Sequence, residues 1–165
     1  MFGFAFKKDT GDTRESPAIY VARHLLDEGA FLSIYDPKVS EDQIHIDLSK
    51  NDANSVHKET TSKQSTANSL RICDQNSSHA NGYHERDRLI VEQCPYQAVE
   101  KAHAIVLCTE CDEFKGYDYP KIYKSMEKPA FIFDGRKILN HEKLIQIGFR
   151  VETIGANLDF VNNSC

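Results

Sequence analysis

The 165-residue sequence has no run approaching the roughly 18 apolar residues of a membrane span, which argues against a membrane protein. It has no basic excess, because its formal net charge is −5 whereas domains that cover nucleic acid usually carry clear positive charge. We expect no export signal in its first residues, since the apolar segment 2–6 comes before Lys7 and Lys8, the reverse of secretory order. We therefore expect a cytoplasmic protein that binds neither membranes nor nucleic acid.

Cysteine is sparse, and its five positions suggest no disulfide framework in a chain without an export signal. These positions are Cys73, Cys94, Cys108, Cys111 and Cys165. Cys108 and Cys111 form a C-x-x-C pattern, which leaves a thiol redox or zinc role as an alternative. A zinc site would want a second closely spaced ligand pair, and a thioredoxin-type cysteine should open a helix. Cys108 is instead expected to close a buried strand, so we predict no metal site.

Apolar strands and helices alternate along most of the chain. Strands are expected over residues 2–6, 31–35, 103–109, 130–134 and 150–154, and helices over 17–28, 96–101, 119–126 and 141–147. Ser16 is typical of a helix N-cap and Pro17 of a first helical residue, while Gly29 and Gly148 are typical of helix ends. Strands that are apolar on both faces and alternate with helices predict a parallel sheet covered on both sides. The predicted fold is therefore α/β, a Rossmann-like doubly wound parallel sheet in a three-layer αβα arrangement.

Residues 49–88 interrupt this pattern. They are rich in Ser, Asn, Thr, Lys and His and contain almost no clustered aliphatic residues. Such a segment buries too little surface to offset the entropy of ordering it. We predict one domain over residues 1–156, interrupted by this long, mobile polar insertion and followed by a tail at 157–165.

The segment GFAFKKDTGDTRES (3–16) follows the first expected strand, and ligands of doubly wound sheets bind at the carboxyl ends of the strands. A dinucleotide cradle there needs G-x-G-x-x-G, but beyond the strand this loop has only Gly11. Side chains must therefore neutralise a phosphate, and Lys7, Lys8 and Arg14 are the candidates. The following helix N-terminus adds partial positive charge. The alternative is a solvated loop whose charges pair with one another.

A second candidate cluster ends another expected strand at FIFDGR (131–136). Gly135 would allow a tight exit from the strand, and Arg136 would supply a second phosphate or sugar contact at the same sheet edge. An ordinary surface turn is the alternative for this cluster taken alone.

Five motifs, in order, resemble the C-terminal, UDP-binding domain of the UDP-glucose 6-dehydrogenases, within the UDP-glucose/GDP-mannose dehydrogenase family. They are GFAFKKDTGDTRES, IYDPKV, HAIVLCTE, KPAFIFDGR and IGFRVETIG, and together they cover most of residues 2–156 outside the stretch from about 49 to 92. The resemblance implies NAD-dependent oxidation of UDP-glucose to UDP-glucuronate. It implies that Phe6, Lys7 and Arg136 contact the UDP-sugar and that Arg14 reaches NAD across a domain cleft.

The sequence also departs from the family's pattern. The resemblance places the NAD domain, the nucleophilic cysteine and the central helix of the family's homo-oligomer in segments that this sequence does not match. No cysteine here lies in a matching Gly-rich context, so we assign no catalytic residue, and Cys111 stands where the family usually has tryptophan. We expect a fragment that binds UDP-sugar weakly and catalyses nothing alone. A noncatalytic module that binds nucleotide sugars is the alternative.

Overall fold

The structure, a computed structural model, describes residues 1–49 and 88–155. The predicted insertion therefore lies outside the described residues except at its two ends, and so does the predicted tail at 157–165. Ser49 is the last residue of helix α2 (Glu41–Ser49), and the Arg88 guanidinium donates to the Leu26 carbonyl at 2.8 Å. None of the described helices combines the length and the apolar character that crossing a bilayer requires.

The strands form two parallel sheets. In one sheet β1 (Leu32–Ile34) pairs with β2 (Leu89–Val91), and in the other β4 (Phe131–Asp134) lies between β3 (Ala104–Leu107) and β5 (Arg150–Glu152).

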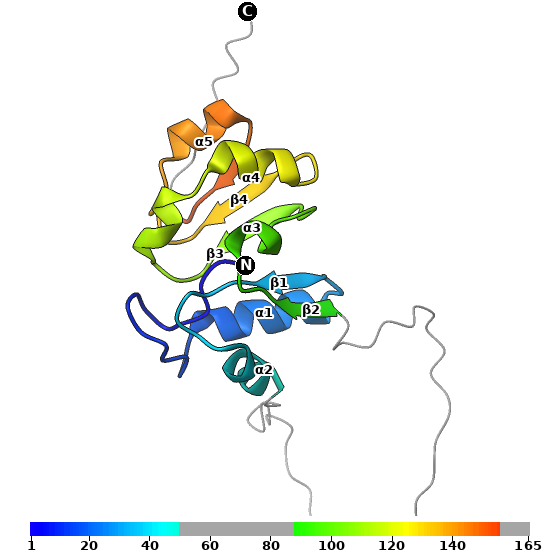
Figure 1. Cartoon of the computed structure of the whole chain (residues 1–165), viewed down its shortest axis with the longest axis vertical. Coiled ribbons are helices and arrows are strands. Elements are labelled where there is room, and N and C mark those ends of the chain that lie inside the picture. The colour runs from blue at the N-terminus through cyan, green and yellow to red at the C-terminus, as the bar shows by residue number, and fades with distance from the viewer. Residues whose placement is uncertain (50–87, 156–165) are drawn as a thin grey trace, which may run out of the picture.

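Phe2 joins the two sheets. It makes isolated parallel bridges to Tyr35, just after β1, and to Leu107 at the end of β3. Figure 1 shows the N-terminus between β1 and β3. The spatial order is therefore β2, β1, Phe2, β3, β4, β5, which in chain order reads 3-2-1-4-5-6, the order of a Rossmann sheet. This confirms the predicted fold class.

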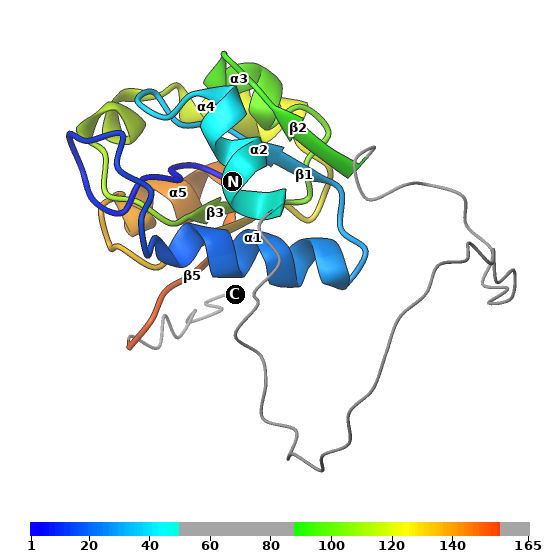
Figure 2. The same cartoon turned by 90° about the horizontal axis from the view of Figure 1, so that it is seen from below.

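Helices cover both faces of the sheet. Figures 1 and 2 show α1 (Pro17–Asp27) and α2 on the side of β1 and β2, whereas α4 (Tyr119–Ser125) and α5 (His141–Ile147) lie with β4 and β5. Strand β3 packs against helices on both of its faces. On one face, Ile105 and Leu107 pack in the cluster that contains Ile122 of α4 and Leu144 of α5. Val106 and Cys108 belong instead to the cluster that contains residues of α1 and α2.

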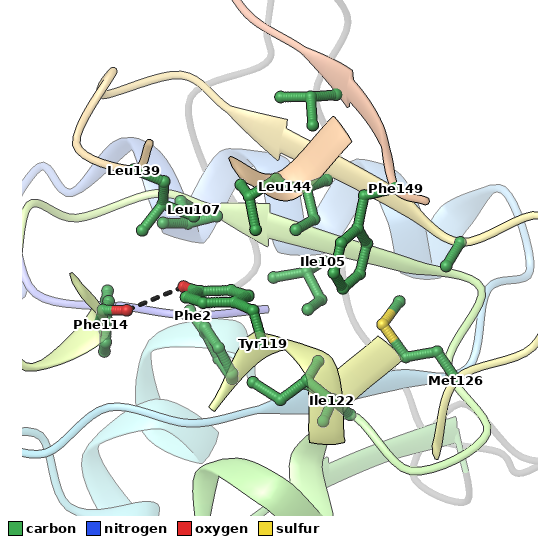
Figure 3. Packing of buried hydrophobic residues seen from close by; sticks show 14 of the residues in the cluster. Phe2, Ile105, Leu107, Phe114, Tyr119, Ile122, Met126, Leu139, Leu144 and Phe149 are labelled. Atoms are coloured by element: carbon green, nitrogen blue, oxygen red, sulfur yellow. Dashed lines mark hydrogen bonds between the residues drawn. The ribbon is translucent and has the colours of Figure 1, made fainter. Parts of the chain in front are cut away.

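The larger cluster is built around aromatic rings. Figure 3 shows Phe2, Phe114 and Tyr119 close together, and the Tyr119 hydroxyl donates to the Phe114 carbonyl at 2.8 Å. Phe114 comes from the short 3-10 helix η2 (Asp112–Gly116) after β3. Buried apolar side chains of this kind provide the main driving force for the fold.

One expected strand was wrong in its extent. Residues 2–6 were expected to form a strand, but only Phe2 pairs, and the chain leaves the sheet at Gly3, where φ is +83°. The next amides, of Phe4 and Ala5, donate to the Asp36 carboxylate at 2.6 and 3.0 Å rather than to a neighbouring strand. The Asp36 carboxylate therefore takes the place of a neighbouring strand as the hydrogen-bond partner of these two amides.

Candidate functional site

The candidate site lies where the strand order reverses, between Phe2 and β3. In open α/β sheets ligands bind outside the carboxyl ends of the strands at this switch point. The loop after Phe2 and the loop after β3 meet there, since the Lys8 ammonium lies 3.5 Å from the Asp112 carboxylate. The predicted position of the site at this edge is therefore compatible with the fold.

Asp36 shows how this edge differs from a dinucleotide site. In dinucleotide-binding sheets an acidic residue about 20 positions after the Gly-rich turn takes the ribose hydroxyl. Asp36 follows β1, but its two oxygens accept from four backbone amides, of Phe4, Ala5, Lys38 and Val39 (2.6, 3.0, 2.8 and 3.1 Å). The Asp36 carboxylate therefore binds the backbone of the segment after Phe2 and of its own turn, and not a ribose hydroxyl.

Phe6 and Lys7 lie on the exposed side of the first loop. Phe6 is 48% exposed, and its amide donates to the Asp12 carbonyl at 2.8 Å. Lys7 is exposed, and its positive charge contributes to lowering the pKa of Asp12. Both side chains are accessible to a ligand.

Lys8 and Arg14 are engaged in ion pairs within the protein. The Arg14 guanidinium makes a forked contact with Asp12, with Nη2 to Oδ2 at 2.7 Å and Nε to Oδ1 at 2.9 Å. These hydrogen bonds, aided by the Arg14 amide, lower the pKa of Asp12 to about 2. The alternative interpretation of the loop, in which its charges pair with each other, describes Arg14, whereas Lys8 pairs with Asp112 of η2.

Arg136 occupies a better defined position. Its Nε donates to the Cys108 carbonyl at 2.7 Å, so the guanidinium lies against the carboxyl end of β3. Within residues 1–49 and 88–155 this is the one hydrogen bond of the Arg136 side chain, which leaves its two terminal NH₂ groups for a ligand.

Asp134 anchors the loop that carries Arg136. Its fully buried carboxylate accepts from the amides of Arg136 and Leu139 at 3.1 and 3.0 Å and lies 2.9 Å from His141 Nε2. Such a satisfied buried carboxylate restricts the loop conformation, since each lost bond would leave a buried carboxylate oxygen with fewer hydrogen-bond partners.

A pocket of about 520 Å³ opens beside Arg136. Its lining comes from the start of α1, the ends of β3 and β4, and β5 with the residues after it: Pro17, Val21, Val106, Leu107, Cys108, Phe133, Gly135, Arg136, Glu152, Thr153 and Ile154. Of the four predicted site residues only Arg136 lines this pocket, whereas Phe6, Lys7 and Arg14 lie in the loop beyond it. The sequence pattern alone did not indicate that these four would be divided in this way.

Cys108 and Cys111, the two cysteines of the C-x-x-C pattern, show no sign of activation. Burial raises the pKa of Cys108, against smaller lowering effects of the Met1 amine and Arg136, and burial also raises the pKa of Cys111. A reactive cysteine has a lowered pKa instead. Residues 1–49 and 88–155 contain no group of three His, Cys, Asp or Glu side chains placed to hold a metal ion.

Sequence reasoning missed the anchoring role of Asp36 and the acceptor role of the Cys108 carbonyl. From sequence, Asp36 was noted only within the IYDPKV motif, although an acid just after a strand of this fold is a signal worth testing. A backbone carbonyl leaves no signal in a sequence, so the contact of Cys108 with Arg136 required the tertiary structure.

Residues 1–141 match the UDP binding domain of the UDP-glucose/GDP-mannose dehydrogenase family. The chain is 46% identical over 157 residues to UDP-glucose 6-dehydrogenase of Bos taurus, covering 94% of this chain and 26% of that protein. It is 48% identical over 155 residues to UDP-glucose 6-dehydrogenase of Drosophila melanogaster, covering 94% of this chain and 27% of that protein. The chain thus spans about a quarter of the length of these relatives.

Two solved structures have the same fold. NDP-N-acetyl-D-galactosaminuronic acid dehydrogenase from Methanosarcina mazei superposes with a TM-score of 0.62 at 20% identity, over 95% of this chain and 24% of that one. UDP-D-ManNAc dehydrogenase from Pyrococcus horikoshii gives a TM-score of 0.57 at 24% identity, over 93% of this chain and 24% of that one. At these identities the likeness concerns the fold.

Proposed function

Because this chain belongs to the UDP-glucose/GDP-mannose dehydrogenase family, we propose that it binds the UDP-sugar in the NAD-dependent oxidation of UDP-glucose to UDP-glucuronate. Arg136 carries the proposal: it lies at the carboxyl end of β3, next to the switch point of the sheet, and lines a pocket, and of its side-chain nitrogens Nε alone is hydrogen-bonded within the described residues. The proposed partners are UDP-glucose, UDP-glucuronate and NAD, within a cytoplasmic oxidoreductase.

Each candidate side chain supplies a different contact. The Arg136 guanidinium is a planar fork that grips two oxygens of a diphosphate or sugar, whereas the Lys7 ammonium is a compact charge on a flexible stem. The exposed Phe6 ring provides an apolar surface beside the nucleotide sugar. Arg14, 88% exposed at its side chain and paired with Asp12, is proposed to face NAD rather than the diphosphate.

The pocket beside Arg136 has mostly apolar walls, and its two charged lining residues are Arg136 and Glu152. This composition fits a ligand with a less polar body whose anionic group lies at Arg136. The loop of Phe6 and Lys7 lies on the other side of the β3 carboxyl end. We propose that a diphosphate bound over that end contacts both cations.

Thermal unfolding with added UDP tests this function. A ligand that binds only the folded state adds about 2.7 kcal/mol of stability at 100 times its Kd, so UDP should raise Tm by several degrees. Arg136→Ala should abolish the increase because it removes the proposed diphosphate fork.

Lys143→Ala is the matched control, because it removes one positive charge from an exposed position on α5, away from the pocket lining. This variant should keep the full UDP-dependent increase in Tm. An unchanged Tm for the unaltered chain at millimolar UDP would contradict the proposed function.

A further inference from the structure

The backbone just before Phe6 and Lys7 is held by three side chains from three different elements. Asp36, after β1, accepts from the amides of Phe4 and Ala5. The Ser16 hydroxyl, at the N-cap of α1, donates to the Phe4 carbonyl at 2.7 Å, and the Thr109 hydroxyl, after β3, donates to the Ala5 carbonyl at 2.5 Å. Every polar backbone group of Phe4 and Ala5 is thereby bound.

The contacts of Ser16 and Thr109 are buried inside the protein, and those of Asp36 are partly buried. Phe4 and Ser16 have no exposed surface, and Ala5 and Thr109 are 2% and 3% exposed. A buried carbonyl needs a hydrogen-bond partner, so the Thr109 hydroxyl has no water to replace it if it is removed. The conformation of this segment therefore depends on these side chains and not on sheet pairing.

Thr109 is also packed tightly against the point where the chain leaves the sheet. A Cβ at Gly3, where φ is +83°, would lie 2.5 Å from the Thr109 Cβ. The Thr109 side chain thus fills the space beside Gly3 and bonds the carbonyl two residues later, which sets the direction in which Phe6 and Lys7 leave the sheet.

The residue before Thr109 holds the other cation. The Cys108 carbonyl accepts from Arg136 Nε at 2.7 Å. One dipeptide at the carboxyl end of β3, Cys108–Thr109, is therefore bonded to the segment of Lys7 on one side and to Arg136 on the other. Among the described residues, no other adjacent pair bonds both the segment before Lys7 and the Arg136 side chain. Asp134 bonds only the loop of Arg136, and Asp36 bonds the segment before Lys7 but not the loop of Arg136.

We propose that Thr109 is a positioning residue that sets the spacing between Lys7 and Arg136 and so matches the site to a diphosphate rather than a monophosphate. This inference rests on the proposed function. Thr109 does not touch the ligand in this proposal; it acts through the Ala5 carbonyl. A change of spacing should therefore affect a ligand that spans both cations more than a ligand that reaches one.

The test compares the binding of UDP and UMP to the 165-residue chain by isothermal titration calorimetry. Thr109→Val keeps the shape of the side chain and removes its hydroxyl. We expect it to weaken UDP binding at least tenfold and to change UMP binding less than threefold, so that the preference for UDP is lost. Thr109→Ser, which keeps the hydroxyl, should restore most of that preference.

Ser125→Ala is the matched control, because the Ser125 hydroxyl also donates to a backbone carbonyl, that of Ile122 at 2.9 Å, but in α4. It should leave both affinities unchanged. If Thr109→Val does not fold, Thr109→Ala provides the same comparison without bulk beside Gly3. A purely structural role would lower Tm and leave the UDP to UMP affinity ratio unchanged, which would overturn the inference.

The outcomes separate this inference from the proposed function. If the unaltered chain binds UDP and Thr109→Val keeps its preference for UDP over UMP, the inference is wrong and the proposed function stands. If the unaltered chain binds neither nucleotide, the proposed function fails, and the inference fails with it.

Discussion

Arg14 and Arg136 show how neighbouring atoms decide what an arginine can bind. Both were predicted from sequence to meet a nucleotide ligand. Arg14 donates from both Nε and Nη2 to the Asp12 carboxylate on the solvent-exposed surface. Arg136 donates only from Nε, to the Cys108 backbone carbonyl. An arginine already paired with a carboxylate must give up that pair to bind a phosphate, so Arg136 is the better anion contact.

The Asp12 and Arg14 pair predicts a pH dependence. Asp12 has a pKa of about 2 instead of the ordinary 3.8, chiefly because the Arg14 side chain donates to it. A lowered folded-state pKa means that the pair contributes in full above the unfolded value and is lost as pH falls through about 2. Arg14→Gln should raise the pKa of Asp12 toward 3.8, as NMR titration of the carboxyl carbon would measure.

Lys143→Gln is the control for that titration, since it removes an equal charge from α5. It should leave the titration of Asp12 unchanged. An Asp12 midpoint that is the same in the Arg14→Gln variant and the unaltered chain would mean that another group lowers it.

Among the elements, helices with strong end signals were predicted most accurately. Helix α1 begins at Pro17 with Ser16 as its N-cap, and α5 covers His141–Ile147 with Gly148 at its end, both as predicted. The end of α1 was misplaced by one residue, because Glu28 is the C-cap and Gly29 follows it with φ +87°. Capping is a local interaction, so sequence carries its signal.

Gly148 provides a test at this scale. Its φ is +118°, and a Cβ there would lie 2.6 Å from the Tyr123 hydroxyl oxygen. Gly148→Ala should lower the free energy of unfolding by about 1–3 kcal/mol, because it adds backbone strain and a clash at the end of α5. Urea denaturation would measure the loss.

Gly116→Ala is the comparison for that variant. Gly116 ends η2, and no atom lies within 4 Å of a Cβ placed there. This substitution should change the free energy of unfolding by less than about 0.5 kcal/mol. Equal losses in the two variants would contradict the assigned role of Gly148.

The elements that sequence reasoning missed have weak local signals. Helix α2 buries only Ile44 and Asp47, so its apolar pattern is too sparse to detect. Strand β2 is three residues long, and η2 is a single short 3-10 segment. Asp47 accepts from the Thr13 hydroxyl at 2.5 Å, so α2 supports the first loop through a polar contact that hydrophobic periodicity does not reveal.

At the scale of the whole molecule, Phe2 connects the two parallel sheets into one, because it bridges to Tyr35 and to Leu107. Its ring is fully buried, and its centroid lies 5.3 Å from that of Phe114 and 6.0 Å from that of Tyr35. On the β3 side, the Phe2 amide donates to the Val106 carbonyl at 2.8 Å and the Cys108 amide donates to the Phe2 carbonyl at 3.0 Å. On the β1 side, the residues flanking Phe2 make the bonds: the Gly3 amide donates to the Tyr35 carbonyl at 2.9 Å, and the Tyr35 amide donates to the Met1 carbonyl at 3.0 Å. The switch point, and hence the proposed site, depends on Phe2.

The whole chain is expected to bind without catalysing. It has no G-x-G-x-x-G cradle for NAD, and burial raises rather than lowers the pKa of Cys108. With UDP-glucose and NAD, the purified chain should therefore form no NADH above background, as absorbance at the NADH band would measure. Sustained turnover, with the Bos taurus relative as positive control, would contradict this prediction.

Sequence alone determined the alternation of strands and helices, the fold class, the family resemblance and the identity of the cationic loops. These features depend on local apolar patterns, caps and short motifs. Only the tertiary structure decided that Asp36 accepts from the loop amides and that Cys108–Thr109 is bonded both to Ala5, in the segment before Lys7, and to Arg136. These contacts join residues that are mostly far apart in sequence, and their partners are often backbone groups that every residue carries, so no residue type announces them.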